Sequence, residues 1–239
     1  MRTPEIDWPE GVQVHLGEDS EQVALNLAEA VAGFLRERLA LASRASLVVS
    51  GGSTPLPFFR ALSRENLDWH RVDLLLADER WVPEDDPASN TRLVRENLLQ
   101  GHAADANFLS LKQPGATPQE GLEAVKAELA GLALPLDVLI LGMGNDGHTA
   151  SLFPDAPELA EAMSPDCREL VAASTPPSQS QQRVTLTWPP LRDARFTALH
   201  LKGGDKLETL RRAMAVPDDV MSMPIRGFLK PGLNVFWSP

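Results

Sequence analysis

An acid and a histidine follow an apolar segment near the middle of the chain. Asp146, Gly147 and His148 come soon after the apolar run Val138 to Leu141, which ends in glycines. This pattern predicts a buried strand followed by a tight turn that presents a carboxylate and an imidazole. In open α/β sheets, ligands bind at the carboxyl edge, where such a turn lies. Because an imidazole can accept a proton near neutral pH, His148 is a candidate general base, with Asp146 beside it.

His148 could instead be a structural histidine whose ring is satisfied within the fold, and this interpretation stays open. Its place in a glycine turn, two residues after an acid, favours a functional role. The remaining histidines have no such setting: His15, His70, His102 and His200. With one cysteine, Cys167, and scattered histidines, the chain shows no metal-ligand spacing. We therefore expect neither a metal nor a cofactor.

The glycines at 142–147 also match G-x-G-x-x-G, the pattern of dinucleotide-binding turns. That pattern needs a helix opening at its third glycine, and an acid about 20 residues on, at the end of the next strand. Here Pro154 limits any such helix to a couple of turns. The nearest acid, Glu169, would open the strand-like segment Glu169–Ala173 rather than close it. A bound nucleotide is therefore not expected.

A second glycine turn follows the short apolar strand Leu47 to Val49. Its residues are small or hydroxylic, and a helix-like pattern continues after them: Ser50, Gly51, Gly52, Ser53 and Thr54. Glycines let backbone N–H groups approach an anion, hydroxyls add donors, and a helix N-terminus favours negative charge. No lysine follows, so this is not a Walker A loop. The turn is a candidate phosphate site, and an ordinary strand-to-helix turn is the alternative.

Several charged residues are placed where they could reach the same edge of a sheet. Asp78 and Arg80 follow the predicted strand Val72 to Ala77, and arginine can clamp a phosphate or carboxylate in a bidentate manner. Arg183 opens another predicted strand, and Lys206 begins a predicted helix. Taken singly, each of these has a simpler interpretation, as a surface ion pair or a solvated charge.

Helical and strand-like patterns alternate along the chain. A helix is expected after a cap at Ser20, and Thr117-Pro118-Gln119-Glu120 is a capping box with proline at the first helical position. Strands are expected at Val184–Trp188, Phe196–Leu201 and Leu233–Trp237, and Asp205 is expected to cap a helix. This alternation predicts a mostly parallel sheet with helices on both faces. We expect a single α/β domain over residues 1–239.

Charge and hydropathy limit the possible partners. The chain has 239 residues and a net charge of −11, from 33 acidic and 22 basic residues. Nucleic acid would be repelled, whereas a few local cations can still bind a small anion because charges are screened over about 8 Å. The first residues form no secretory signal, and no apolar run is long enough for a membrane span. We expect a cytoplasmic protein that binds neither nucleic acid nor membrane.

Five segments together resemble the family of the 6-phosphogluconolactonases and glucosamine-6-phosphate deaminases. They are SGGSTP at 50–55, DERWVP at 78–83, Ser89-Asn90, GMGNDGHTASLFP at 142–154 and the segment ending at Arg183. The resemblance runs from about residue 20 to the C-terminus, and the stretch from Asp146 to Pro154 is its most specific part. It implies a Rossmann-like α/β fold without a nucleotide. It also implies hydrolysis of 6-phosphogluconolactone in the oxidative pentose phosphate pathway.

In this interpretation His148 and Asp146 are catalytic, and the 50–54 loop holds the substrate together with Asp78, Arg80, Arg183 and Lys206. The deaminases carry a glutamate five residues after the histidine, where this chain has Phe153. A lactonase needs only one base to activate water, so the sequence favours hydrolysis over isomerisation. The alternatives are an amino-sugar-phosphate isomerase or deaminase, and a sugar-phosphate sensor without catalysis. We expect a sugar-phosphate lactone as partner, and a monomer or weak dimer.

Overall fold

The fold is built on a seven-stranded parallel sheet, seen in a computed structural model that describes residues 5–239. Its strands lie in the order β1-β10-β9-β6-β2-β3-β5. They are β1 (Gln13–Leu16), β2 (Ala45–Val49), β3 (Val72–Leu76), β5 (Asn107–Leu109), β6 (Val138–Leu141), β9 (Phe196–Lys202) and β10 (Leu233–Ser238). Strands β2, β3 and β6 are buried along their whole length, which explains their continuous apolar sequence.

A second, three-stranded antiparallel sheet was not predicted from the sequence. It has the order β4-β8-β7, with β4 (Asp78–Arg80), β7 (Val171–Ser174) and β8 (Arg183–Leu186). The strand predicted at Val184–Trp188 corresponds to β8. The observed strand starts one residue earlier than predicted, at Arg183, and ends at Leu186, because Trp188 already begins a short helix. The segment from Asp78 to Arg80 is a strand, so its side chains have fixed directions.

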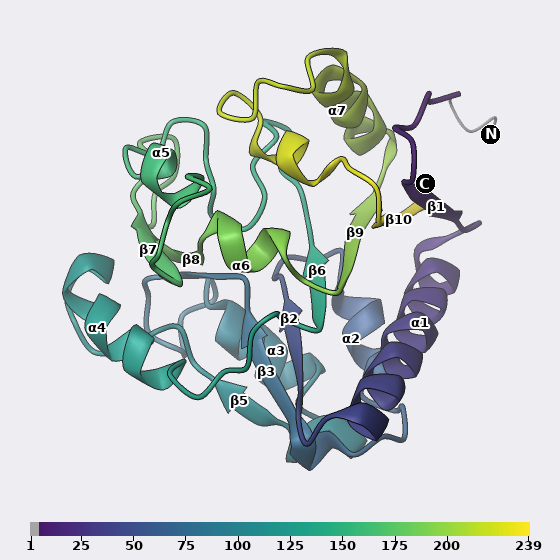
Figure 1. Ribbon diagram of the computed structural model, residues 1–239. Helices are drawn as coiled ribbons and strands as arrows, with labels where there is room; N and C mark the ends of the chain where they lie inside the picture. The colour runs from purple at the N-terminus through teal and green to yellow at the C-terminus, as the bar shows by residue number, and fades with distance from the viewer. Residues whose placement is uncertain (1–4) are drawn as a thin grey trace.

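Helices connect and cover the strands. They are α1 (Ser20–Leu41), α2 (Leu56–Leu62), α3 (Asn90–Asn97), α4 (Pro118–Glu128), α5 (Leu159–Ala162), α6 (Trp188–Arg192) and α7 (Gly204–Ala215). Short 3₁₀ turns span Trp69–Arg71, Gly101–Asp105 and Pro224–Phe228. Figure 1 shows α1 and α2 on one side of the large sheet, and the small sheet with α4 and α5 on the other. The fold class expected from the sequence, a mostly parallel α/β sheet with helices on both faces, is confirmed.

Two predicted helix caps are wrong, and one is present. The carboxylate of Asp19, rather than the hydroxyl of Ser20, accepts a hydrogen bond from the backbone N–H of Gln22 at the start of α1. Asp205 lies within the first turn of α7, whose cap position is a glycine. At α4, Thr117 Oγ1 accepts the N–H of Glu120 as expected. A short polar side chain near a helix start leaves the cap uncertain by a residue, because neighbouring residues can supply the same oxygen.

The carboxyl ends of β2, β6 and β9 lie at the same edge of the large sheet. Val48 pairs with Leu139, and Leu141, the last residue of β6, pairs with Leu199, so β9 extends three residues beyond the end of β6. The turns that follow β2, β6 and β9 therefore meet at one place, and they carry the candidate site.

Within residues 5–239, no helix combines the length and the apolar character that crossing a membrane would need.

Candidate active site

The turn after β6 holds His148 and Asp146 in contact. Nδ1 of His148 lies 2.5 Å from Oδ1 of Asp146, and the backbone N–H of His148 donates to the same carboxylate oxygen at 3.0 Å. Burial alone would raise the pKa of Asp146, but the hydrogen bonds from the ring and backbone of His148 outweigh it and lower that pKa. Asp146 is thus held as a carboxylate that accepts from Nδ1, which leaves Nε2 of His148 unbonded.

Glycines in this turn are required by space and by backbone shape. A Cβ on Gly144 would lie 2.1 Å from Cε1 and 2.2 Å from Nδ1 of His148. Gly147 has a φ of +82°, a conformation that side-chain-bearing residues rarely adopt. No helix opens at Gly147; Thr149 and Leu152 form an isolated bridge instead. The glycines that match a nucleotide fingerprint therefore serve to place an imidazole close to the backbone.

Phe153 lies behind the imidazole. Its ring stacks on that of His148, with centroids 4.0 Å apart and planes 22° apart. The guanidinium carbon of Arg183 lies 4.9 Å from the centre of the same phenyl ring. Phe153 is fully buried, so it is a fixed platform that contacts both side chains.

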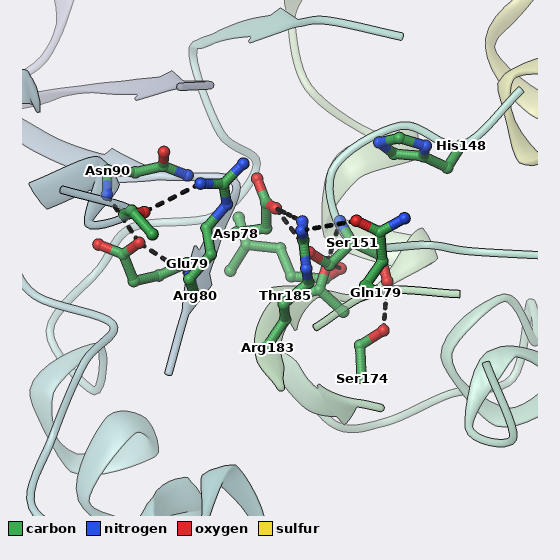
Figure 2. Close-up of polar contacts among 12 residues, drawn as sticks. Asp78, Glu79, Arg80, Asn90, His148, Ser151, Ser174, Gln179, Arg183 and Thr185 are labelled. Carbon is green, nitrogen blue, oxygen red and sulfur yellow. Dashed lines mark hydrogen bonds and ion pairs between the residues drawn. The ribbon is translucent and has the colours of Figure 1, made fainter. Parts of the chain in front are cut away.

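Arg183 is buried beside Asp78. Its Nη1 lies 4.0 Å from Oδ2 of Asp78, and its Nη2 donates to Gln179 at 3.2 Å (Figure 2). Asp78 also accepts a 2.6 Å hydrogen bond from the hydroxyl of Ser151. Burial lowers the pKa of Arg183, with Asp78 opposing and Arg80 adding to the effect, yet a guanidinium stays charged in proteins. The result is a weakly paired cation that lines a cavity.

Arg80 lies directly opposite Arg183, because β4 and β8 pair with these two residues in register. Opposite residues of an antiparallel pair point to the same face, so two cations that are distant in sequence become neighbours. Nη1 of Arg80 donates to the carbonyl of Ala88 at 2.9 Å. The surface ion pair considered for this segment is not seen, since Asp78 and Glu79 are both buried.

Glu79 has a structural function. Its carboxylate accepts the backbone N–H groups of Asn90 and Thr91 at 2.9 and 2.7 Å and the Thr91 hydroxyl at 2.7 Å (Figure 2). Burial raises the pKa of Glu79, and these hydrogen bonds oppose part of that effect. Glu79 thereby ties the start of α3 to β4. It also positions Asn90. The side-chain oxygen of Asn90 would lie only 2.1 Å from a Cβ on Gly51, so this close approach requires glycine.

The glycine turn after β2 faces the same space. The hydroxyl of Ser50 donates to the carbonyl of Ile140 at 2.9 Å, which fastens the turn to β6. Because α2 has only seven residues, the turn offers backbone N–H groups and hydroxyls rather than the dipole of a long helix. From the first turn of α7, Lys206 reaches Asn145 with its Nζ 2.9 Å from Oδ1.

These side chains surround one cavity of about 470 Å³. Nearly all residues singled out in the sequence line it: Ser50, Gly51, Gly52, Ser53, Thr54, Asp78, Arg80, His148, Arg183 and Lys206. Asp146 is not a lining residue and acts on the cavity only through His148. Across residues 5–239, no group of three or more histidine, cysteine or acidic side chains is arranged to hold a metal ion.

Asn90 and His200 are among the lining residues that the sequence analysis did not propose as site residues. Asn90 was noted only as part of a family motif, and His200 was set aside because it has no neighbouring acid or glycine turn like that of His148. A polar residue near the carboxyl end of an otherwise apolar buried strand is the signal that would have indicated His200. Strand β9 ends at the cavity, so its final residues lie at the site.

The chain is similar to known proteins in sequence and in fold. The sequence model described as "Glucosamine-6-phosphate isomerases/6-phosphogluconolactonase" matches residues 18–237. A 6-phosphogluconolactonase of Pseudomonas aeruginosa is 46% identical over 239 residues, covering both chains completely. The crystal structure of a 6-phosphogluconolactonase from Shewanella baltica superposes with a TM-score of 0.92 at 41% identity, covering 96% of this chain and 99% of the other.

A monomeric glucosamine-6-phosphate deaminase also has this fold, with a TM-score of 0.75 at 18% identity over 95% of this chain and 97% of that one. At that identity the likeness concerns the fold alone. The matches in sequence and fold identify a class of α/β enzymes that includes glucosamine-6-phosphate isomerases and 6-phosphogluconolactonases. This chain belongs to the glucosamine-6-phosphate isomerase/6-phosphogluconolactonase family.

Proposed function

We propose that this protein hydrolyses 6-phosphogluconolactone to 6-phosphogluconate, with His148 as the general base. The observation that carries the proposal is the pairing of His148 Nδ1 with the Asp146 carboxylate on the wall of a cavity that is also lined by the buried Arg183 and the half-buried Arg80. The names of relatives with 46% and 41% identity support the same reaction.

The pairing supports Nε2 of His148 as the nitrogen that accepts the proton. A carboxylate beside Nδ1 accepts a hydrogen bond from the N–H of that nitrogen, so the lone pair of the neutral ring lies on Nε2. Nε2 then takes a proton from a water molecule as the water oxygen attacks the lactone carbonyl carbon. A tetrahedral oxyanion and an imidazolium result, and Asp146 stabilises the imidazolium.

Collapse of this intermediate opens the ring. The carbonyl re-forms, the bond between the carbonyl carbon and the ring oxygen breaks, and the ring oxygen takes the proton from Nε2. The product is a carboxylic acid, which releases a proton to solvent and becomes the carboxylate of 6-phosphogluconate. His148 is neutral again, and the only reactants consumed are water and the lactone.

The phosphate of the substrate is assigned to the cationic part of the cavity. Arg183 is buried with only a long contact to Asp78 and one hydrogen bond to Gln179, so it has capacity for a further acceptor. Arg80, Lys206 and the N–H groups of the 50–54 loop line the same space. A chain of charge −11 needs such a local cluster to attract an anionic substrate.

Phe153 argues against isomerisation of an amino-sugar phosphate. The deaminase pattern has a glutamate at this position, which would supply a second proton-transferring group. Here the position holds a buried phenyl ring that stacks on the imidazole, so no carboxylate can reach the substrate from it. Hydrolysis requires no such group.

The decisive test is turnover of the phosphorylated lactone by the purified chain, with glucosamine 6-phosphate offered separately. Because this lactone opens unaided in water, the rate without enzyme must be subtracted. We expect enzyme-dependent release of acid from the lactone and no ammonia from glucosamine 6-phosphate. Binding of both compounds without turnover of either would instead identify a sugar-phosphate sensor.

A further inference from the structure

His200 is a lining residue to which the proposed mechanism gives no part. It lies on β9 opposite Phe236 of β10, it is only 5% exposed, and it borders the cavity. Its ring meets that of Phe58 edge to face, with centroids 6.0 Å apart. The ring is therefore fixed by packing, as a recognition group should be.

Neither ring nitrogen of His200 makes a hydrogen bond within residues 5–239. In residues 5–239, three buried side-chain nitrogens lack a hydrogen-bond partner: Nε of Arg80, Nε of Arg183 and Nδ1 of His200. All three belong to residues that line the cavity. Buried polar groups are normally paired, so these three atoms mark side chains whose hydrogen-bonding capacity is not fully used within the fold.

The two ring nitrogens differ in access. Nδ1 is sealed from solvent, whereas Nε2 is not among the sealed atoms and makes no hydrogen bond within the described chain. A proton on Nδ1 would be an N–H with no acceptor, which is costly. The proton therefore belongs on Nε2, where a molecule in the cavity can accept it.

His200 also stays neutral. Burial lowers its pKa to about 4, so near neutral pH the ring adds no charge beside Arg183, Arg80 and Lys206. An uncharged donor can still bind strongly to an ionised acceptor, because hydrogen bonds to charged groups are the stronger ones.

His200 lies near the elements that are proposed to bind the phosphate. Leu199 pairs with Leu141, so His200 is level with Gly142, next to the strand to which Ser50 is fastened. Phe58, which it contacts, belongs to the helix that the 50–54 loop opens. Continuing along the chain, β9 leads into the first turn of α7 and Lys206. The 50–54 loop and Lys206, which are both assigned to the phosphate, are thus connected to His200 through neighbouring elements.

We propose that the Nε2–H of His200 donates a hydrogen bond to an oxygen of the substrate's phosphate monoester. The proposal rests on the phosphate subsite of the proposed function and adds to it a neutral donor. It makes His200 a binding residue that discriminates phosphorylated from unphosphorylated ligands, not a participant in proton transfer to the lactone.

The test uses His200→Phe, which keeps a flat ring against Phe58 but has no donor, and His200→Gln, whose amide nitrogen reaches nearly as far as Nε2. His200→Asn places its amide nearer to Nδ1. Binding of inorganic phosphate and of 6-phosphogluconate is measured by calorimetry for each folded variant. We expect about 10- to 150-fold weaker binding of both ligands to His200→Phe and His200→Asn, the range for a bond to a charged acceptor. His200→Gln should stay within about threefold of the wild-type chain.

The outcomes separate the two proposals. If the wild-type chain hydrolyses the lactone but His200→Phe binds phosphate as tightly as wild type, the inference about His200 is wrong and the proposed function stands. If His200→Phe loses affinity for 6-phosphogluconate alone, His200 contacts the sugar and the phosphate assignment is overturned. If the wild-type chain neither binds phosphate nor hydrolyses the lactone, both proposals fail. Should His200→Phe not fold, the contrast between His200→Gln and His200→Asn decides the same question.

Discussion

The imidazole of His148 lies flat against the phenyl ring of Phe153, with ring centroids 4.0 Å apart. Because Phe153 is fully buried, this stack fixes one face of the imidazole while Asp146 holds Nδ1. The proposed base is thus restrained in both position and rotation. A general base must be held within hydrogen-bond reach of the water that it activates, so the restraint bears directly on rate.

Replacing Phe153 with leucine should therefore lower kcat more than it weakens binding. The stack is worth about 0.5–1.5 kcal/mol, so we expect a kcat about 2- to 13-fold lower and a KM within about twofold. Steady-state kinetics and urea unfolding measure the two effects. Phe59→Leu is the matched control, since Phe59 is equally buried but does not line the cavity. A similar loss of kcat in both variants would mean that general loosening, not the stack, is responsible.

Removing the imidazole should abolish most of the catalysis. General-base catalysis contributes about 10²- to 10⁴-fold, so His148→Ala should lose that much in kcat and still bind 6-phosphogluconate. His15→Ala serves as the control, because His15 is hydrogen-bonded to Asn234 and lies away from the cavity lining. A folded His148→Ala variant with kcat within threefold of wild type would exclude His148 as the base.

A single methyl group at Gly144 should also lower kcat, although both proposed catalytic side chains are still present. The added Cβ would overlap the His148 ring at 2.1–2.2 Å, so the imidazole must turn away from Asp146. We expect Gly144→Ala to lower kcat by at least about tenfold, since small displacements of catalytic groups are costly. Gly33→Ala, with no atoms near the added methyl, should leave kcat unchanged. A crystal structure of Gly144→Ala with the 2.5 Å contact intact would contradict the explanation.

Arg183 should matter for the phosphate and little for the lactone ring. A bond to a charged group is worth about 1.5–3 kcal/mol, so Arg183→Ala should lower kcat/KM for the phosphorylated lactone by about 10- to 150-fold. The loss should shrink greatly with unphosphorylated gluconolactone. Arg192→Ala, which removes only a surface pair with Asp193, is the control. Equal losses on both substrates would place Arg183 outside the phosphate subsite.

Stability should decrease in acid partly because of His200. Its pKa is about 4 in the folded chain against 6.5 ordinarily, so between these values the unfolded chain binds the extra proton. Stability then rises with pH, being complete above about pH 6.5 and lost as pH falls towards 4. At pH 4.5 the loss is about 2–3 kcal/mol relative to pH 7. Urea unfolding of wild type and His200→Gln at both pH values isolates this amount, because other titrating groups are shared. Equal losses in the two proteins would show that His200 is not the source.

Much of the site could be predicted because it is local in sequence. The turn from Gly142 to His148 and the loop from Ser50 to Thr54 are continuous segments, each following a buried strand at the same sheet edge. Their glycines, hydroxyls and paired acid and imidazole act over a few bonds, so residue types and spacing already describe them. The alternation of strands and helices predicted the parallel sheet for the same reason.

The cation cluster and its surroundings were decided only by the tertiary structure. Arg80 and Arg183 become neighbours because β4 and β8 pair antiparallel, in a small sheet whose strand pairing no local pattern indicated. Phe153 contacts both His148 and Arg183, and His200 reaches the cavity only because β9 adjoins β6. Such contacts join residues far apart in the chain, and their pairing depends on the global packing of strands. Sequence periodicity predicts on which face of its own helix or strand a side chain lies. It does not predict which other element packs against that face.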